Sequence, residues 1–559
     1  MTIQFDEDKQ KQQLEELRKK EEEDFAKVLA EKYSLEYIDL ILVPINTDAL
    51  RLIKEADARA AKIAAFNIVG KNVQVAVQSP STEITQKIIK TLEQAEYSVT
   101  VFTTTPESLE KAWSHYKELS YSTESTVGAL DVSSDEIATF LGKVHTIKDI
   151  GVLIQNLLTE KKSYKISRII ELIIAGALAT KASDIHIEPE EDYARLRFRL
   201  DGVLNDVIRF DRNVFDMILN RIKLLSGLKL NIKTEAQDGR FSVKINTDDI
   251  EIRTSLLPGA YSESVVLRIL NPKSISVPIE DLGIAPALLK ILMHEISKPS
   301  GMLLTTGPTG SGKTTTLYAF LRKVHTTDIK IITIEDPIEY HLPGVVQTQT
   351  NAEKGYTFLE GLRSALRQDP DIIMVGEIRD SETAEIAINA ALTGHLVFST
   401  LHTNTAAGTF PRLIDLGVNA KTMSSAISVS MAQRLVRKLC ESCKKETPLD
   451  AATKKIVDEV VSTMKDKSVI TNTAKMWTEV GCDKCNHTGY KGRIGIYEAI
   501  LMDGAIEAII RQNPSEREIQ KAAEPQGIPT LKQDGITKLL AGVTSINELT
   551  RIIDLEKDL

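Results

Sequence analysis

The sequence predicts an α/β fold built around a phosphate-binding loop, and three observations point to it. Residues 307–314 read Gly-Pro-Thr-Gly-Ser-Gly-Lys-Thr and complete the G-x-x-x-x-G-K-[ST] pattern. A strand-like apolar run, residues 302–306, precedes the loop and a helix-like run, residues 315–324, follows it, as this motif requires. Beyond Pro278, strand-like and helix-like runs continue to alternate, which indicates a parallel sheet covered on both faces.

The loop is predicted to bind a nucleoside triphosphate. Glycines let it wrap a phosphate chain, so that backbone N–H groups and the N-terminus of the following helix point at the anion. Lys313 would neutralise the β- and γ-phosphates, and Thr314 would ligate Mg²⁺ through its hydroxyl. The residues predicted to contact the nucleotide are Gly307, Thr309, Gly310, Ser311, Gly312, Lys313, Thr314 and Thr315.

Length and composition bound the class of protein. A chain of 559 residues exceeds one hydrophobic core and suggests about three or four domains. No run approaches the roughly 18 apolar residues of a membrane span, so any membrane role should be peripheral. Residues 1–10 lack the apolar core of a signal peptide, which predicts a cytoplasmic protein. The net charge of −9 argues against a broad nucleic-acid surface, and no nucleic-acid partner is expected.

The N-terminal part divides into three predicted segments. Residues 1–24 form a charged leader, more consistent with a solvated helix or a disordered segment than with a docking helix. Residues 25–119 form a small α+β domain, with strands expected at 73–77 and 98–102. Residues 120–163, rich in Ser and Thr at their start, are interpreted as a linker.

A second α+β domain is predicted over residues 164–275. A helix is followed by strands at 184–187 and 194–200. Tight turns are expected at Asp201-Gly202 and at Asp238-Gly239, because these pairs are typical of β-hairpins.

Acidic residues follow two apolar strands of the C-terminal region. The first strand ends in Glu335, Asp336 and Glu339, at the edge where ligands bind in α/β sheets. One of these carboxylates could hold Mg²⁺ through water and another could polarise the attacking water. A second strand ends in Glu377, as a Walker B strand does, and leaves the division of base and metal roles open. The alternative for either strand alone is a buried strand with a solvated acidic tip.

A histidine lies at the end of a third strand in this region. His402 follows the apolar residues 396–401, where a sensor of the γ-phosphate would lie. The alternative is a structural hydrogen-bond donor, and the sensor is favoured.

Two cysteine pairs predict a metal site. All four cysteines fall within residues 436–498 and none is left over: Cys440, Cys443, Cys482 and Cys485. Each pair has two intervening residues, a spacing typical of a closed structural Cys₄ zinc site. Disulfides are disfavoured in a reducing cytoplasm, and reduced, metal-free thiols are the remaining alternative.

Taken in order, these motifs closely resemble the secretion ATPases that drive type II secretion and type IV pilus assembly. The resemblance extends from about residue 164 to the C-terminus. Besides the loop, it rests on residues 182–189 (Ala-Ser-Asp-Ile-His-Ile-Glu-Pro), 333–339, 372–377, 393–404 and 492–498 (Gly-Arg-Ile-Gly-Ile-Tyr-Glu). It implies a RecA-like ATPase domain at 276–559 that includes the zinc-binding insertion, a preceding PAS-like lobe at 164–275, and an N-terminal secretion-ATPase domain at 25–119.

The resemblance also implies active sites between the subunits of a homohexamer. Arg253 and Arg268 match arginines that reach the neighbouring nucleotide in that family, where a guanidinium fork delocalises charge on the transferred phosphoryl group. Their alternative is a pair of surface strand arginines. Residues 259–264 read Gly-Ala-Tyr-Ser-Glu-Ser, where the family commonly has a Gly-Glu-Lys turn.

The paired cysteines resemble those of assembly and export members, so the resemblance implies pilus extension. The expected protein is a homohexamer that hydrolyses ATP with Mg²⁺ and lies at the inner face of the cytoplasmic membrane. Its implied partners are an inner-membrane platform protein and associated cytoplasmic pilus proteins. A type II secretion ATPase is the nearest alternative. A DNA-translocating P-loop motor is disfavoured by the net charge, and a scaffold without turnover by the presence of Glu339 and Glu377.

Overall fold

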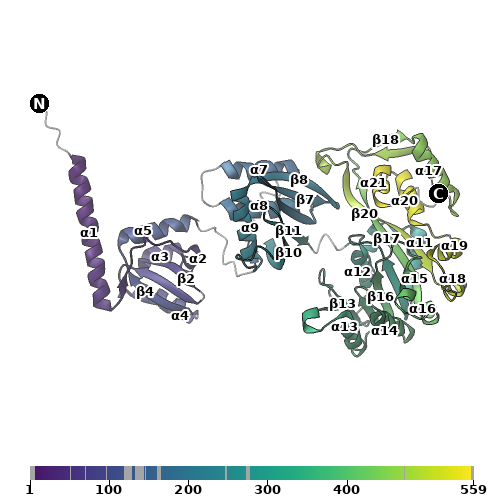
Figure 1. Cartoon of the computed structure of the whole chain (residues 1–559), viewed down its shortest axis with the longest axis horizontal. Coiled ribbons are helices and arrows are strands. Elements are labelled where there is room, and N and C mark those ends of the chain that lie inside the picture. The colour runs from purple at the N-terminus through teal and green to yellow at the C-terminus, as the bar shows by residue number, and fades with distance from the viewer. Residues whose placement is uncertain are drawn as a thin grey trace.

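The structure is a computed structural model, and it shows three units in a row behind a long N-terminal helix, α1 (Glu7–Tyr33) (Figure 1). The described residues are 7–50, 52–69, 71–95, 97–118, 129–131, 144, 146–159, 165–245, 248–271, 277–470 and 472–555. Among them, no helix combines the length and apolar character needed to cross a membrane.

The first unit is a four-stranded sheet in the order β1-β4-β3-β2, packed with short helices. Its strands are β1 (Glu36–Tyr37), β2 (Ile63–Val69), β3 (Asn72–Val77) and β4 (Ser98–Thr103). Its helices are α2 (Thr47–Leu50), α3 (Glu55–Ala61), α4 (Glu83–Gln94) and α5 (Pro106–Ser114). The strands predicted at 73–77 and 98–102 are thus confirmed.

Helix α1 crosses the predicted boundary between leader and first domain at residue 24. Ala26 and Ala30 are buried, and the backbone carbonyl of Ala26 accepts a hydrogen bond from Thr103 Oγ1 (3.2 Å). The last turns of α1 therefore pack on the first unit, whereas residues 1–6 of the predicted leader lie outside the described part of the chain.

The second unit is a seven-stranded sheet in the order β5-β9-β10-β11-β6-β7-β8. Its strands are β5 (Ala129–Asp131), β6 (Asp184–Pro189), β7 (Tyr193–Leu200), β8 (Val203–Asp211), β9 (Gln237–Ile245), β10 (Asp248–Pro258) and β11 (Glu263–Leu270). Only β5 pairs in parallel among these strands; the other pairs are antiparallel. Asp201 (φ 48°) and Gly202 (φ 86°) form the predicted turn between β7 and β8, since a two-residue hairpin favours positive φ at both positions.

The second predicted turn, at Asp238-Gly239, is wrong. Both residues lie inside β9, where they pair with Ser255 and Thr254. A Cβ atom at Gly239 would lie only 2.5 Å from the carbonyl oxygen of Ser226. Glycine is therefore needed here for a close backbone approach inside a strand and not for a hairpin.

Helix α7 (Ile147–Thr159) lies within the predicted linker, residues 120–163. Ile150 and Ile154 are buried in the core of the second unit, because their spacing places both on one face of a helix. Gly176 of helix α8 (Lys165–Ala179) lets α7 approach, since a Cβ there would lie 2.8 Å from Ile150 Cδ1. The linker prediction therefore extended into a packed element, and most of its remainder lies outside the described residues.

The third unit is a seven-stranded sheet in the order β14-β13-β15-β16-β12-β17-β20. Its strands are β12 (Gly301–Thr306), β13 (Ile331–Glu335), β14 (Val346–Gln349), β15 (Ile372–Val375), β16 (Leu396–Leu401), β17 (Ile427–Leu439) and β20 (Tyr490–Leu501). All pairs are parallel except β17 with β20. Leu303 of β12 belongs to one core, and Met302 and Leu304 belong to another. Both faces of this sheet are therefore covered, as the sequence predicts, and the chain has a mixed α/β fold.

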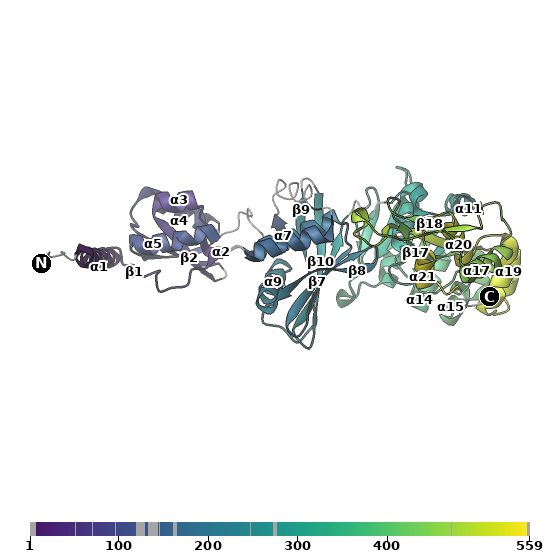
Figure 2. The same ribbon diagram turned by 90° about the horizontal axis from the view of Figure 1, so that it is seen from above.

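Helices cover the sheet of the third unit and extend to the C-terminal end of the chain (Figures 1 and 2). Those before β17 are α11 (Pro286–Ile296), α12 (Lys313–Val324), α13 (Phe358–Leu366), α14 (Ser381–Leu392), α15 (Thr409–Asp415) and α16 (Ala420–Ala426). The hairpin of β18 (Lys445–Pro448) and β19 (Lys475–Thr478), with α17 (Ala451–Ser462) between its strands, leads to β20. The chain then forms α18 (Gly504–Ile510), α19 (Glu516–Ala523), α20 (Leu531–Leu540) and α21 (Ile546–Ile552).

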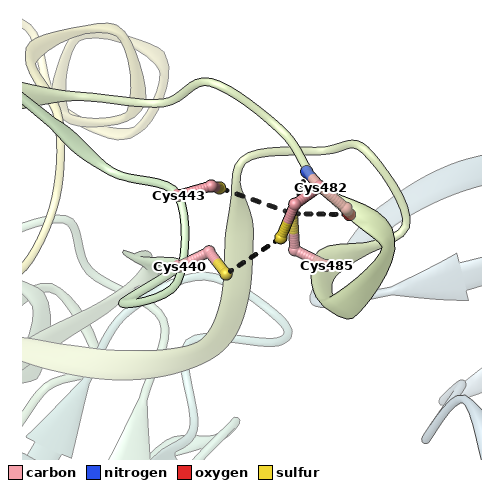
Figure 3. Close-up of side chains that lie close together, drawn as sticks. All are labelled: Cys440, Cys443, Cys482 and Cys485. Carbon is pink, nitrogen blue, oxygen red and sulfur yellow. Dashed lines mark hydrogen bonds between the residues drawn. The ribbon is translucent and has the colours of Figure 1, made fainter.

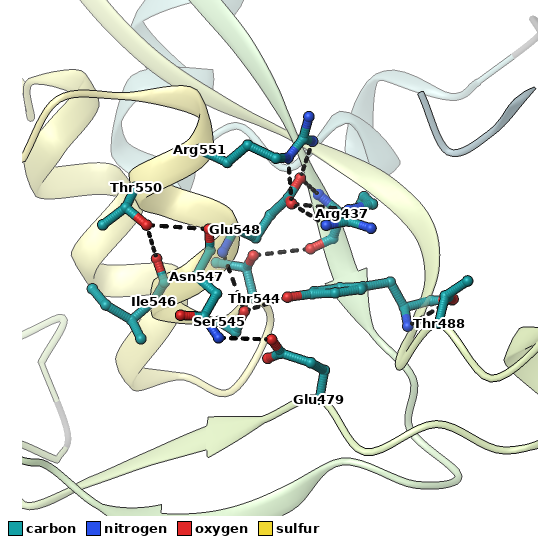
Figure 4. Close-up of polar contacts among 11 residues, drawn as sticks. Arg437, Glu479, Thr488, Thr544, Ser545, Ile546, Asn547, Glu548, Thr550 and Arg551 are labelled. Atoms are coloured by element: carbon teal, nitrogen blue, oxygen red, sulfur yellow. Dashed lines mark hydrogen bonds and ion pairs between the residues drawn. The ribbon is translucent and has the colours of Figure 1, made fainter. Parts of the chain in front are cut away.

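A buried carboxylate of helix α21 forms hydrogen bonds to β17 (Figure 4). The side chain of Glu548 is fully buried and accepts hydrogen bonds from Arg437 Nε (2.9 Å) and Arg551 Nε (2.9 Å). It also accepts the backbone N–H of Arg437 (3.0 Å). Burial would raise the pKa of Glu548, but these hydrogen bonds outweigh it and hold the pKa below its usual value.

In the described part of the chain, hydrogen bonds join the second and third units at two separate places. Asp201 Oδ2, in the β7–β8 turn, accepts a hydrogen bond from the backbone N–H of Gly492 (2.8 Å). Asn486 Oδ1 accepts one from the backbone N–H of Ile147 (2.8 Å), at the start of α7. The second place is Arg253 of β10, whose Nη2 donates to the carbonyl oxygen of Ile338 (2.7 Å).

Candidate active site and metal centre

The predicted phosphate loop connects β12 to α12, and its shape depends on glycine. Gly307, Gly310 and Gly312 have φ values of 147°, 79° and 89°, which side chains rarely adopt. Strand β17 lies directly against the loop: a Cβ would lie 2.6 Å from the Gln433 carbonyl oxygen at Gly307 and 2.7 Å from Gln433 Nε2 at Gly312. The loop is therefore held in this shape by its own backbone and by a neighbouring strand.

The loop carries groups that fit a phosphate chain. Lys313 begins α12, and its Nζ donates to the carbonyl oxygen of Gly307 (2.8 Å). Burial lowers the pKa of Lys313, and the nearby charge of Glu377 acts in the opposite direction. Ser311 Oγ is buried without a hydrogen-bond partner among the described residues. A phosphate oxygen would supply that partner, so these residues fit the predicted nucleotide.

Glu377, which follows β15, lies in a polar cluster at the carboxyl edge of the sheet. His402 Nε2 lies 2.8 Å from its Oε2, because β15 and β16 are parallel neighbours. Arg379 forms an ion pair with the same carboxylate and lies 4.0 Å from Asp336 Oδ2. Burial would raise the pKa of Glu377, but hydrogen bonds from Arg379 and His402 outweigh it, so the pKa lies below its usual value. The structure thus brings Glu377 and His402 together beside an arginine that sequence reasoning missed.

Glu335 lies in a different environment from Glu377. It ends β13, is only 3% exposed, and accepts hydrogen bonds from Thr333 Oγ1 (2.5 Å), Gln347 Nε2 (3.0 Å) and the Tyr318 hydroxyl. Burial raises the pKa of Glu335 despite these donors. Since its donors come from β13, β14 and α12, this carboxylate joins three elements of the third unit.

Glu339 lies where the second unit meets the third. Its Oε2 is 3.9 Å from Nη1 of Arg253. Arg253 and Arg268 are directly opposite each other on β10 and β11, and Arg268 Nε donates to Asp184 Oδ1 (3.0 Å). The structure therefore brings Arg253 to Glu339 of the same chain, whereas Arg268 is held by β6 and remains 62% exposed.

A second arginine missed by sequence reasoning lies under the phosphate loop. Arg434 of β17 is largely buried, and its Nη2 donates to the carbonyl oxygen of Asn404 (2.7 Å). A Cβ at Gly307 would lie 3.0 Å from its Nη1. The available signal was a charged residue inside an otherwise mostly apolar strand, residues 427–436, which is unusual unless that charge has partners.

The four cysteines lie together, as predicted (Figure 3). The Sγ–Sγ distances are 3.9 Å for Cys440–Cys482 and 3.8 Å for both Cys443–Cys485 and Cys482–Cys485. No disulfide links them. Four sulfurs at about 2.3 Å from a tetrahedral zinc ion are about 3.8 Å apart, so the spacing fits zinc. The backbone N–H of Gly481 also donates to Cys443 Sγ (3.3 Å).

The chain is similar to known secretion proteins. A family model described as Type II/IV secretion system protein matches residues 159–551. Type II secretion system protein E of Aeromonas hydrophila is 43% identical over 398 residues, which cover 71% of this chain and 77% of that protein. Type II secretion system ATPase E of Vibrio cholerae serotype O1 is 40% identical over 398 residues, with the same coverage of both chains. Type IV pilus assembly ATPase PilB of Thermus thermophilus is 42% identical over 388 residues, which cover 69% of this chain and 43% of that protein.

Proposed function

The chain belongs to the type II/IV secretion system protein family, and from this premise we propose that it is a hexameric motor that powers pilus assembly. It is an ATPase, like its relatives from Vibrio cholerae and Thermus thermophilus. One observation supports a working site above the others: the phosphate loop carries a buried Ser311 hydroxyl without a partner among the described residues, and the same sheet places Glu377 2.8 Å from His402.

In the proposed site, the loop and the first turn of α12 hold the triphosphate. Gly307, Thr309, Gly310, Ser311, Gly312, Lys313, Thr314 and Thr315 supply these contacts. Lys313 exchanges the carbonyl of Gly307 for the β- and γ-phosphates, and Thr314 ligates Mg²⁺. When bound, the ion neutralises charge that develops on the transferred phosphoryl group.

Hydrolysis is assigned to the acidic residues at the carboxyl edge of the sheet. Glu339 activates the attacking water in this proposal, and Glu377 orients it or holds Mg²⁺ through water. His402 senses the γ-phosphate through its contact with Glu377. Glu335 is the weaker candidate of the group, because its oxygens are already occupied by buried donors.

The hexamer is proposed from two arginines that lie opposite each other on neighbouring strands. Arg253 and Arg268 are a directly opposed cross-strand pair, and like charges in this position are unfavourable without an anion nearby. Asp184, Glu251 and Glu339 of the same chain meet part of that need. We assign the remainder to the nucleotide of a neighbouring subunit, where each arginine would stabilise transition-state charge.

Mixed oligomers test this assignment. Arg268→Ala chains are expected to be nearly inactive alone but to retain an intact loop, while Lys313→Ala chains retain their arginines. Mixing them restores activity at interfaces that join an intact loop to intact arginines, because an arginine of this kind is worth about 10³–10⁵ in rate. Near-wild-type turnover by Arg268→Ala, or full activity of a dilute monomer, would show that one chain holds a complete site.

The finer fold assignment belongs to the same proposal. We assign residues 276–559 to a RecA-like domain with a zinc element at 436–498, and residues 164–275 to a PAS-like lobe. Residues 25–119 form the N-terminal domain, preceded by the 1–24 leader. The 120–163 segment contains α7, whose buried face supports joining that helix to the lobe.

The proposed motor acts in the cytoplasm at the inner membrane face, on a platform protein and associated pilus proteins. The relative named PilB supports pilus assembly, and the relatives named protein E support type II secretion as the second candidate. Deleting the gene in its host distinguishes them. Loss of surface pili, restored by the wild-type chain but not by Glu377→Gln, is expected; loss of secreted enzymes with intact pili would favour type II secretion.

A further inference from the structure

The loop after β16, residues 402–408, is anchored through successive residues, and we call it the sensor loop. At its start, His402 contacts Glu377 at 2.8 Å. The backbone N–H of Thr403 donates to Thr306 Oγ1 (2.8 Å), at the end of the strand that enters the phosphate loop. The first two residues of the sensor loop are therefore bonded to Glu377 and to the strand that enters the phosphate loop.

The next residue, Asn404, is connected to the phosphate loop through Arg434 of β17. Arg434 Nη2 donates to the carbonyl oxygen of Asn404 (2.7 Å) and Nη1 donates to that of Gln433 (2.9 Å). Because Arg434 also lies against Gly307, a movement of the phosphate loop would disturb the position of Asn404.

The following two residues are attached to the C-terminal helices. Thr405 Oγ1 donates to Glu516 Oε1 (2.5 Å), at the start of α19. The backbone N–H of Ala406 donates to Oε1 of Glu498 (2.7 Å), and the other oxygen of Glu498 accepts the backbone N–H of Leu531 (3.1 Å), the first residue of α20. One carboxylate of β20 thus joins the sensor loop to a helix.

We propose that Glu498 is a positioning residue of the ATPase reaction, whose carboxylate couples the sensor loop that carries His402 to the first turn of α20. The proposal rests on the proposed function, because it takes His402 to lie near the γ-phosphate. It gives a role to the acid that ends the 492–498 motif, which the catalytic assignment leaves unused.

The chemistry of this position requires a carboxylate. Leu531 N–H is one of the donors that a helix leaves unpaired at its N-terminus, and a negative charge is favourable there. Two oxygens satisfy two backbone donors that belong to different elements. A glutamine would offer only one such oxygen and would turn its NH₂ group toward the second donor.

Steady-state kinetics of Glu498→Gln test the proposal in the full-length chain. We expect kcat for ATP to fall about 10- to 100-fold, the cost of slightly misplaced catalytic groups. The KM for ATP and the Kd of a non-hydrolysable ATP analogue should change less than about twofold, because Glu498 does not touch the phosphate loop. A fall in analogue affinity that accounts for the lost activity would overturn the positioning role.

Asp534→Asn is the matched control. Asp534 is a buried carboxylate of α20, the helix that Glu498 contacts. It accepts a hydrogen bond from the backbone N–H of Tyr497, the residue before Glu498, at 2.8 Å. Within the described part of the chain Asp534 bonds to Tyr497 and Lys538 and not to the sensor loop, so its loss should lower stability while leaving kcat within about threefold. An equal fall of kcat in both variants would reduce Glu498 to a structural residue.

Hydrogen exchange of the full-length protein, wild type and Glu498→Gln, provides a second test. Adding the ATP analogue should slow exchange at Ala406 and Leu531 together, and Glu498→Gln should abolish the change at Leu531 only. Protection of Ala406 without Leu531 in the wild type would refute the coupling. Failure of the proposed function is separately visible, because normal hydrolysis by Glu377→Gln would remove the catalytic assignment and leave this exchange result intact.

Discussion

The phosphate loop and the tetracysteine cluster are two candidate ligand sites that the same unit builds in opposite ways. The loop has its final shape through glycine conformations and through β17, which leaves no room for a Cβ at Gly307 or Gly312. The cysteine sulfurs lie 3.8–3.9 Å apart, too far for disulfides. Their mutual attraction as thiols is weak, so only a shared ligand can hold all four strongly.

This difference indicates which site depends on its ligand for its shape. A loop stabilised by its backbone should keep its shape when the nucleotide leaves. A closed Cys₄ centre obtains folding free energy from the metal itself, so it should lose its shape with the ion.

Removal of the metal should unfold the zinc element proposed at residues 436–498 and leave the phosphate loop folded. Structural zinc supplies about 10–16 kcal/mol of apparent binding free energy, and purified protein should hold about one zinc ion per chain. After chelation, all four thiols should react with a thiol reagent and amides of residues 482–489 should exchange rapidly. Affinity for an ATP analogue should remain within about twofold. Absence of zinc from protein purified without chelator, with freely titratable thiols, would contradict the site.

Lys313→Ala should reduce ATP hydrolysis at least about 1000-fold, because the loop loses the cation that faces the β- and γ-phosphates. The loop itself should stay folded, since its shape comes from Gly307 and Gly312. Turnover is measured by phosphate release, and folding by hydrogen exchange of residues 301–312. Activity within twofold of wild type would end the assignment of the P-loop.

The carboxylates should separate into catalytic and structural groups. Glu339→Gln should bind ATP but lose about 10²–10⁴ in turnover, since an amide accepts a proton poorly. Glu377→Gln should lose a similar factor, since an amide lacks the charge that would orient the water or hold Mg²⁺. Glu335→Gln should mainly lower stability, because it replaces a buried acceptor of three donors. Nucleotide binding, phosphate release and thermal unfolding are compared for all three. Normal hydrolysis by Glu339→Gln with inactive Glu335→Gln would reverse the assignment.

Glu548 should show that protein contacts, rather than the ion, hold α21 against β17, the strand that leads to Cys440. Because the pKa of Glu548 is lowered in the folded chain, its stabilising effect is complete above the unfolded pKa of about 4.3 and is lost as the pH falls through the lower folded value. Glu548→Gln should destabilise α21 by about 1.5–3 kcal/mol at neutral pH, and this difference should shrink below about pH 4.

Exchange rates of residues 546–552 at several pH values, with metal bound, measure this effect. Glu507→Gln is the control, because the Glu507–Arg511 ion pair of α18 is substantially exposed and should contribute little. A pH-independent difference between wild type and Glu548→Gln would exclude the charge as its source.

Local sequence signals were sufficient where a residue's neighbours in sequence determine its structure. The phosphate loop, the strands β12, β15 and β16, and the Asp201-Gly202 turn all follow from patterns within about ten residues. The cysteine cluster followed from spacing and from the absence of other cysteines. Even the meeting of Glu377 and His402 could be expected, because parallel strands bring their carboxyl ends to one edge.

Contacts between distant segments could not be predicted in this way. Asp238-Gly239 has a hairpin composition, yet the need for a glycine arises from Ser226, which approaches it only in the folded sheet. Likewise, the donors of Glu498 lie at Ala406 and Leu531, and no local pattern links these positions. A buried polar residue shows in a sequence as an anomaly, but its partners are determined by topology.

The hydrogen bonds from the zinc element to the second unit have a thermodynamic consequence. Asn486 directly follows Cys485 and accepts the first N–H of α7, while Gly492 donates to Asp201. The predicted zinc binding and the docking of the second unit should therefore be linked equilibria, in which each favours the other by the same free energy. A truncated chain that lacks the second unit should accordingly hold its zinc less tightly than the whole protein, although that unit supplies none of the ligands.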